Sequence, residues 1–192
     1  MNQSSVRRGV RTRHIACFGM LAAIAYAVML VCQLIPPVAG FLSFDLKDVV
    51  IAISGFLFGP ATGLMISLVV CLVEMVTVSG TGPVGMLMNV LSTLAFVLPA
   101  ALLYRRRRDR KSAILGLLAG VVVMTAVMLL WNLIVTPGYL KVPRDTVIDM
   151  MPLLLGFNLA KGAANAVVTM LLYKPVVTAL RKAGLAPSHD EN

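Results

Sequence analysis

Long apolar stretches separated by short polar segments dominate the pattern of the chain. A transmembrane helix needs about 20 apolar residues, because the hydrocarbon core is ~30 Å thick and each helical residue rises ~1.5 Å. Four stretches reach this length, and they cover residues 14–35, 84–104, 113–136 and 151–174. The pattern therefore predicts at least four membrane-spanning helices.

A fifth apolar region, residues 48–78, is too long for one ordinary span and short for two. The pair Gly59-Pro60 lies inside it, and a Gly-Pro pair is typical of a turn. Pro60 also suits the first turn of a helix, where its missing N–H is not needed. We therefore predict two short helices that meet at Gly59-Pro60, tilted or partly shielded from lipid by their neighbours.

Three basic clusters determine the predicted topology. They occupy residues 7–13, 105–111 and 174–182. Lys and Arg in short loops gather on the cytoplasmic side of a membrane. All three clusters share one side only if residues 48–78 cross the membrane twice. This arrangement makes six transmembrane helices with both termini in the cytoplasm.

The composition supports an all-α integral membrane protein. Of the 192 residues, 59% are hydrophobic and 13% are charged, against about 45–50% and 25% in soluble domains. A soluble protein of 20.5 kDa could not bury so much apolar surface, so a soluble enzyme, a disordered chain and a disulfide scaffold are excluded. We predict one membrane domain, with a basic cytoplasmic tail (1–13), a six-helix bundle (14–180) and a second cytoplasmic tail (181–192).

The charge of +9 does not indicate nucleic-acid binding in this context. Residues 105–111 would suit a phosphate backbone on a soluble protein. Beside an apolar span they are better interpreted as a topology anchor that contacts anionic lipid headgroups.

Nothing in the sequence indicates catalysis or a metal site. Cys17, Cys32 and Cys71 lie in apolar stretches without metal-ligand spacing, so we expect them to be small core residues. His14 and His189 are far apart in the chain, and no cluster of histidine, cysteine and carboxylate accompanies either. The chain also lacks a P-loop for ATP. A transport function would therefore need energy from a partner.

Polar residues inside the spans are the strongest candidates for a binding site, because they are costly in lipid and usually functional. Lys161 lies ten residues past Met151, roughly 15 Å into its span. Asn158 shares its helix face, and Asn132 follows Trp131 near the outer end of the preceding span. Amides, one cation and an aromatic plane suit a flat heteroaromatic ligand with a carbonyl-rich edge.

The outer loop 36–48, PPVAGFLSFDLKD, is unusually apolar. We expect it to fold back over the bundle and to bring Phe41, Leu42 and Asp45 to the ligand site. Asp48 is placed to cap the N-terminus of the second helix.

Two other polar residues have structural alternatives. Glu74 could pair with Lys161, or it could be an interfacial carboxylate. Asn89, close to Ser92, is expected to make an interhelical hydrogen bond.

The first span carries Gly19, Ala23 and Ala27 at four-residue spacing. Such a small-residue face lets another helix approach closely. It would serve either to dock a partner membrane protein or to pack inside the bundle.

Several motifs together resemble one known family. They are FLSFDLKDVV in the first outer loop, GFLFGPATGLMISLVVCLVE across the second and third spans, SGTGPVGMLMNVLSTLAF into the fourth, WN at 131–132 and GFNLAKG at 156–162. With them the chain resembles the substrate-binding S component of an energy-coupling factor (ECF) vitamin transporter, and most of all the riboflavin-binding branch.

The resemblance implies a monomeric six-helix fold in a bacterial cytoplasmic membrane, with an outward pocket roofed by the first outer loop. It implies that Asn132, Asn158 and Lys161 contact the flavin ring, and that riboflavin is the transported ligand and not a cofactor. The face of Gly19, Ala23 and Ala27 would meet the membrane-embedded coupling subunit. Two cytoplasmic ATPase subunits would drive transport by toppling the loaded S component.

Three alternatives stay open at this point. A sister S component for pyridoxine, pantothenate or a similar vitamin would use a comparable pocket. A self-contained secondary transporter or channel is disfavoured by the scarcity of intramembrane charges. A membrane enzyme would need an acid/base set or a metal site that the sequence does not offer.

Overall fold

The computed structural model describes residues 3–183 and 185 of the chain. These residues form seven helices, and their only β-structure is one isolated bridge in a loop. The helices are α1 (Gln3–Cys32), α2 (Lys47–Phe58), α3 (Pro60–Thr77), α4 (Gly82–Arg107), α5 (Arg110–Leu140), α6 (Arg144–Asp149) and α7 (Met151–Lys182). The prediction of an all-α protein is therefore confirmed.

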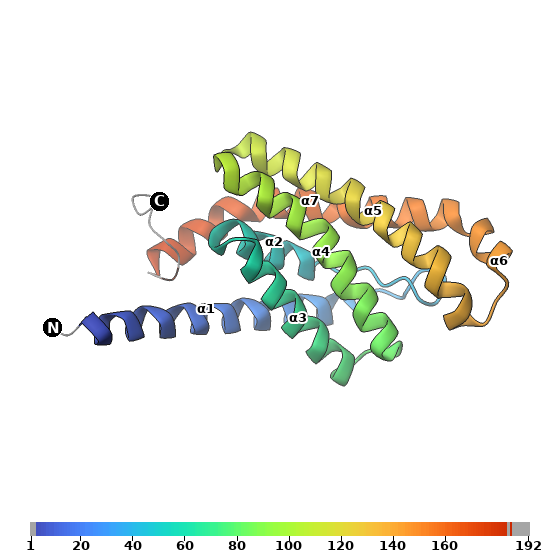
Figure 1. The fold of residues 1–192 in the computed structure, drawn as a ribbon, viewed down its shortest axis with the longest axis horizontal. Coiled ribbons are helices and arrows are strands. Elements are labelled where there is room, and N and C mark those ends of the chain that lie inside the picture. The colour runs from blue at the N-terminus through green and yellow to red at the C-terminus, as the bar shows by residue number, and fades with distance from the viewer. Residues whose placement is uncertain (1–2, 184, 186–192) are drawn as a thin grey trace.

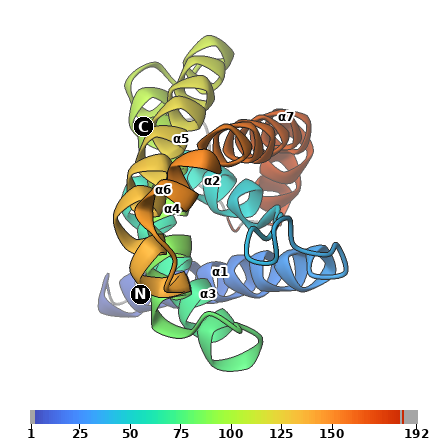
Figure 2. The same cartoon turned by 90° about the vertical axis from the view of Figure 1, so that its right-hand side faces the viewer.

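The helices form an elongated bundle whose two ends differ. In Figure 1, α1 begins and α7 ends at the left, where the turn between α4 and α5 also lies. The loop from α1 to α2 and the short helix α6 lie at the right-hand end. Figure 2 looks onto this second end and shows the loop between α1 and α7.

Among the described residues, five helices are long and apolar enough to cross a membrane: α1, α3, α4, α5 and α7. They account for the four long predicted spans and for the second half of the region 48–78. Large apolar side chains cover their outward faces, for example Val122 on α5 and Leu171 on α7, which are 66% and 69% exposed. Such a surface suits lipid, so the chain is a membrane protein.

Helix α2 is short and central. Its 12 residues span about 18 Å, less than the hydrocarbon core. It contacts α1, α3, α4 and α7, and most of its side chains are buried. The prediction of a short helix shielded by its neighbours is confirmed for α2.

The predicted break at Gly59-Pro60 is also confirmed. Gly59 ends α2 and precedes α3, and its φ of 95° lies in a region that glycine adopts without a steric penalty. Pro60 occupies the first turn of α3, where a proline is tolerated.

Two glycines let α4 and α5 approach closely. A Cβ atom added at Gly116 would lie 2.8 Å from the carbonyl oxygen of Ala100, and one at Gly120 would collide with the carbonyl oxygen of Phe96. Asp109 starts α5 by accepting a hydrogen bond of 2.8 Å from the backbone N–H of Ser112. These features fix the hairpin that carries the central basic cluster.

The structure contains one helix that the sequence did not predict. Helix α6 was not predicted, because six residues are too few for a hydrophobic period to be recognised. The predicted tail 181–192 falls largely outside the described residues, as does the very start of the tail 1–13.

Candidate functional site

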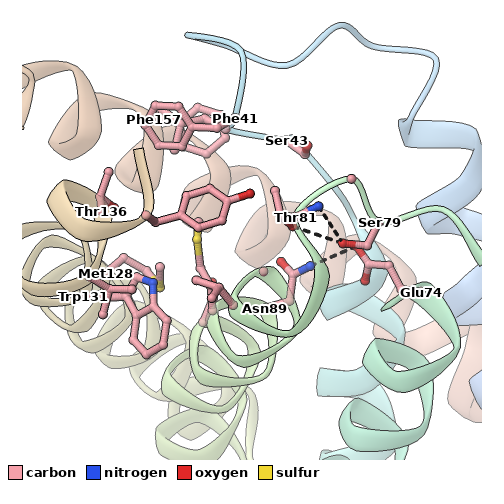
Figure 3. A pocket seen from close by; sticks show the side chains of 18 of the residues that line it. Phe41, Ser43, Glu74, Ser79, Thr81, Asn89, Met128, Trp131, Thr136 and Phe157 are labelled. Carbon is pink, nitrogen blue, oxygen red and sulfur yellow. Dashed lines mark hydrogen bonds between the residues drawn. The ribbon is translucent and has the colours of Figure 1, made fainter. Parts of the chain in front are cut away.

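A cavity opens at the end of the bundle that carries the loop and α6. It has a volume of about 140 Å³. Its walls come from the α1–α2 loop, the end of α3, the α3–α4 turn, and α4, α5 and α7 (Figure 3). The lining residues that were already singled out from the sequence are Phe41, Leu42, Glu74, Asn89, Ser92, Trp131, Asn158 and Lys161.

Aromatic rings line two sides of the cavity. Phe41 from the loop and Phe157 from α7 lie on the roof side, and Trp131 from α5 lies on the opposite side (Figure 3). Tyr139 near the end of α5 adds a fourth ring. Flat aromatic faces favour a flat ligand, because stacked and edge-on ring pairs are attractive beyond the area they bury.

The roof is fixed by the loop that folds back over the bundle, as predicted. Val38 and Leu42 exchange two backbone hydrogen bonds of 2.9 and 3.0 Å, which tighten the loop into a turn. The Leu42 side chain is buried against Val147 of α6 and Leu154 of α7. The roof is thus held by an apolar contact with the last two helices.

Lys161 lies on the cavity wall and is only 6% exposed. Its Nζ donates a hydrogen bond of 3.0 Å to Oδ2 of Asp45, at the end of the roof loop. Asn165, one turn further along α7, donates to the backbone oxygen of Asp45 at 3.1 Å. Helix α7 therefore holds the end of the roof through a charged and a neutral contact.

Glu74 does not pair with Lys161, contrary to one expectation. Its Oε2 accepts a hydrogen bond of 2.6 Å from Nζ of Lys47, and its Oε1 accepts one of 2.9 Å from Asn89 (Figure 3). Lys47 is nearer because it opens α2, which packs directly against α3. The expected interhelical hydrogen bond of Asn89 is confirmed.

Lys47 is 1% exposed, although the sequence did not predict it as a residue of the site. It had the appearance of an ordinary outer-loop lysine. Its Nζ lies 3.6 Å from Asp45 as well as against Glu74, so it joins two carboxylates inside the protein. The available signal was the alternation of opposite charges in DLKD directly before an apolar helix.

A continuous series of polar contacts therefore runs beside the cavity, from Lys161 through Asp45, Lys47 and Glu74 to Asn89. It connects α7, the roof loop, α2, α3 and α4. Buried charges are tolerated when each has a partner of opposite sign and further hydrogen bonds. Each charged side chain in this series lies within 4.0 Å of at least one group of opposite charge, while Oδ1 of Asp45 has no hydrogen-bond partner among the described residues.

Asp48 is not the N-cap residue of α2, so that expectation was wrong. Helix α2 begins at Lys47, and the cap position is Leu46, which makes no side-chain cap. Asp48 lies inside the first turn, is buried, and accepts a hydrogen bond of 2.6 Å from the hydroxyl of Thr93 on α4. It is a buried contact between α2 and α4.

The two asparagines of the predicted site are placed differently. Asn158 lines the cavity, while its Nδ2 donates to the backbone oxygen of Leu154 at 2.8 Å. Asn132 is fully buried behind the wall, where it bonds Met128 at 2.7 Å and Thr136 at 2.9 Å. Because adjacent residues of a helix point about 100° apart, Trp131 faces the cavity and Asn132 does not.

The outer face of α1 carries the small residues. Gly19, Ala23 and Ala27 are exposed, whereas Cys17 and Ala25 are buried on the opposite side. The small-residue face is therefore not used for packing inside this bundle. Cys17, Cys32 and Cys71 are buried and free, as expected of core residues.

Fold and site define a class of protein. A helical membrane bundle encloses a polar cavity with aromatic walls and a loop for a roof. In the described part of the chain, no group of three or more His, Cys, Asp and Glu side chains is arranged to hold a metal ion. The class is a membrane protein that binds a small molecule.

Comparison with known proteins gives the family. Residues 13–173 match the model of the ECF transporter, substrate-specific component. The chain therefore belongs to this family, whose members are transporter subunits and not enzymes.

Individual relatives agree with this placement. The chain is 28% identical to the riboflavin transporter RibU of Staphylococcus aureus (strain TCH60), over 90% of this chain and 94% of that protein. It is 26% identical to the riboflavin transporter FmnP of Bacillus subtilis (strain 168), over 91% and 98%. A solved structure of the S component of a bacterial ECF transporter superposes with a TM-score of 0.77 at 30% identity, covering 88% of this chain and 98% of that one.

Proposed function

We propose that this chain is a riboflavin-binding S component, which takes up the vitamin in its cavity and carries it across the membrane with an ECF module. The observation that carries the proposal is the position of Lys161, a buried cation on the wall of a cavity that is also lined by aromatic rings. The riboflavin transporters among its relatives support the choice of vitamin.

The cavity chemistry suits a flavin ring. An ammonium group has three donors, and the contact with Asp45 uses one, so Lys161 can still donate to a ligand carbonyl. The amide of Asn158 lies one helical turn away on the same wall. Trp131 and Phe41 offer faces for the tricyclic ring, with Leu42 closing the roof.

Asp45 and Asn132 take supporting positions in this proposal. Asp45 orients Lys161 and ties it to the roof loop. Asn132 fixes the turn of α5 that presents Trp131, and it reaches a ligand only when its amide leaves Met128 and Thr136. Both residues remain candidates for the binding site.

We place the protein in a bacterial cytoplasmic membrane with six crossings, counting α2 together with the five longer helices. The cavity and the arginine run at the end of α4 lie at opposite ends of α4. The positive-inside rule then puts the cavity outside and both termini in the cytoplasm. Transport by this chain would need a transmembrane coupling subunit, which meets it at the face of Gly19, Ala23 and Ala27, and two cytoplasmic ATPase subunits that supply the energy.

Riboflavin binding tests the proposal directly. Purified protein should quench flavin fluorescence with one saturable site, and excess pyridoxine or pantothenate should not restore the signal. A protein that ignores riboflavin but binds another vitamin would belong to a sister branch. If an ion gradient drove riboflavin uptake into proteoliposomes without ATPase subunits, the protein would instead be a secondary transporter.

The docking face is tested separately with Ala23→Leu. The substitution adds bulk to an exposed position, so it should leave riboflavin affinity unchanged and block ATP-driven uptake by the full complex. Val31→Leu, an exposed substitution further along α1, serves as the control. Loss of riboflavin binding in Ala23→Leu would contradict the proposed role of this face.

A further inference from the structure

A second hollow lies at the end of the bundle opposite the cavity. It has a volume of about 410 Å³ and lies between α1, the α2–α3 turn and the C-terminal end of α4. Figure 1 shows the turn and the end of α4 at the same end of the bundle. Its lining consists of Phe18, residues 55–61, Arg105 and Arg108. None of these residues belongs to the site described above.

The floor of the hollow is apolar and aromatic. The rings of Phe18 and Phe58 meet edge to face, with centroids 5.1 Å apart, and Phe56 packs against Tyr104 at 4.7 Å. At Gly59 no atom lies within 4 Å of the place where a Cβ would stand, so the turn leaves the hollow open. The floor can therefore receive an apolar group from outside.

Two guanidinium groups form the rim. Arg105 and Arg108 are exposed, and no carboxylate of the described residues lies within 4.0 Å of either. Arg108 ends α4 with φ of 50°, a left-handed conformation usually left to Gly or Asn. Arg106 and Arg107 belong to the same basic run but do not line the hollow. The two rim cations are thus available for an anion.

The change from apolar to basic residues along α4 indicates that the hollow lies at the level of the membrane surface. The apolar part of α4 ends at Tyr104, and the arginines follow at once. Leu102 and Leu103, just before them, are 49% and 37% exposed on the outward side of the bundle. Phosphate groups of the lipids lie at this level, and the planar guanidinium fork binds phosphate oxygens in pairs.

We propose that this hollow binds the phosphodiester headgroup of an anionic phospholipid. Arg105 and Arg108 hold the phosphate oxygens, and the aromatic floor takes the glycerol and the adjoining methylene groups. Basic pockets between transmembrane helices bind anionic headgroups in this way. Free phosphate shares the charge but has no apolar part to cover Phe18 and Phe58.

The test is native mass spectrometry of the purified full chain titrated with phosphatidylglycerol, with phosphatidylcholine as the neutral comparison. The double variant Arg105→Gln with Arg108→Gln should lose about tenfold more affinity for phosphatidylglycerol than the matched double variant Arg106→Gln with Arg107→Gln. Both variants lose two charges, but only the first loses direct charge-assisted hydrogen bonds to the phosphate. Inorganic phosphate should compete only weakly. Equal losses in the two pairs would mean diffuse attraction and would overturn the proposal, as would full displacement by inorganic phosphate.

A second variant keeps every charge. Ala61→Phe fills the hollow from an exposed position at the start of α3, so it should also release phosphatidylglycerol. Unchanged lipid affinity in Ala61→Phe would place the lipid elsewhere. If the arginine variant keeps its lipid but no longer copurifies with the coupling subunit, the hollow is a protein-docking site and the proposal is wrong.

Discussion

The charged side chains at the two ends of the bundle are placed in opposite environments. Beside the cavity, Lys47, Lys161, Asp45 and Glu74 are buried and joined in one chain of contacts. At the other end, residues 105–108 carry four arginines that are all exposed. A charge inside the bundle needs a partner, because burial removes its hydration, whereas a charge at the surface keeps its water. The first end is therefore sensitive to the loss of a single charge, and the second is not.

The largest effect is expected for Lys47→Met. The substitution leaves Glu74 and Asp45 without their shared cation, and breaking a buried pair on one side costs about 3–5 kcal/mol. The thermal midpoint in detergent should fall steeply, while Arg106→Gln at the other end should change it little. The double variant Lys47→Met with Glu74→Gln should recover part of the loss, because it removes the unpaired charge. An unchanged thermal midpoint in Lys47→Met would show that the two ends do not differ in their sensitivity to the loss of a charge.

A smaller effect, on binding, is expected for Lys161→Met. It removes the cation of the cavity wall while Asp45 keeps Lys47 at 3.6 Å. Riboflavin affinity should fall by about 1.5–3 kcal/mol, the value of a hydrogen bond to a charged group. Isothermal titration measures the loss, and Lys141→Met, an exposed lysine at the same end, is the control. Unchanged affinity would mean that Lys161 only holds the roof loop.

The sequence predicted most of what depends on local pattern. The long apolar stretches located the spanning helices, and Gly59-Pro60 located the break between α2 and α3. The apolar loop indicated a roof, and the depth of Lys161 in its span indicated a polar cavity. Each of these inferences needs only one segment and the properties of lipid.

What the sequence did not predict depends on how segments meet. The burial of Lys47 results from the packing of α2 among four helices, and nothing local separates it from a solvated loop lysine. Whether Glu74 on α3 pairs with Lys47 or with Lys161 depends on which of the helices that carry these lysines, α2 or α7, lies nearer to α3. Asn132 and Trp131 are adjacent in sequence but point about 100° apart, so the orientation of α5 about its own axis decides which of them faces the cavity.

The smallest effect is expected for Asp109 at the basic end. Hydrogen bonds from the side chain and backbone of Ser112 lower the pKa of Asp109 below its usual value. The ionised carboxylate is therefore the stabilising form. Its contribution is complete above the unfolded-state pKa of ~3.9 and is lost as the pH falls through the lower folded-state pKa. Asp109→Ala should lower the thermal midpoint slightly at neutral pH and remove this acid dependence.

Asp109→Asn separates the two parts of that effect. Asparagine caps a helix as well as aspartate, so the midpoint at neutral pH should stay near that of the original chain while the acid dependence disappears. Because Asp109 is fully exposed, water screens its charge and the difference between the variants stays small. A loss in Asp109→Ala as large as that in Lys47→Met would contradict the contrast between a buried, paired end and an exposed, hydrated one.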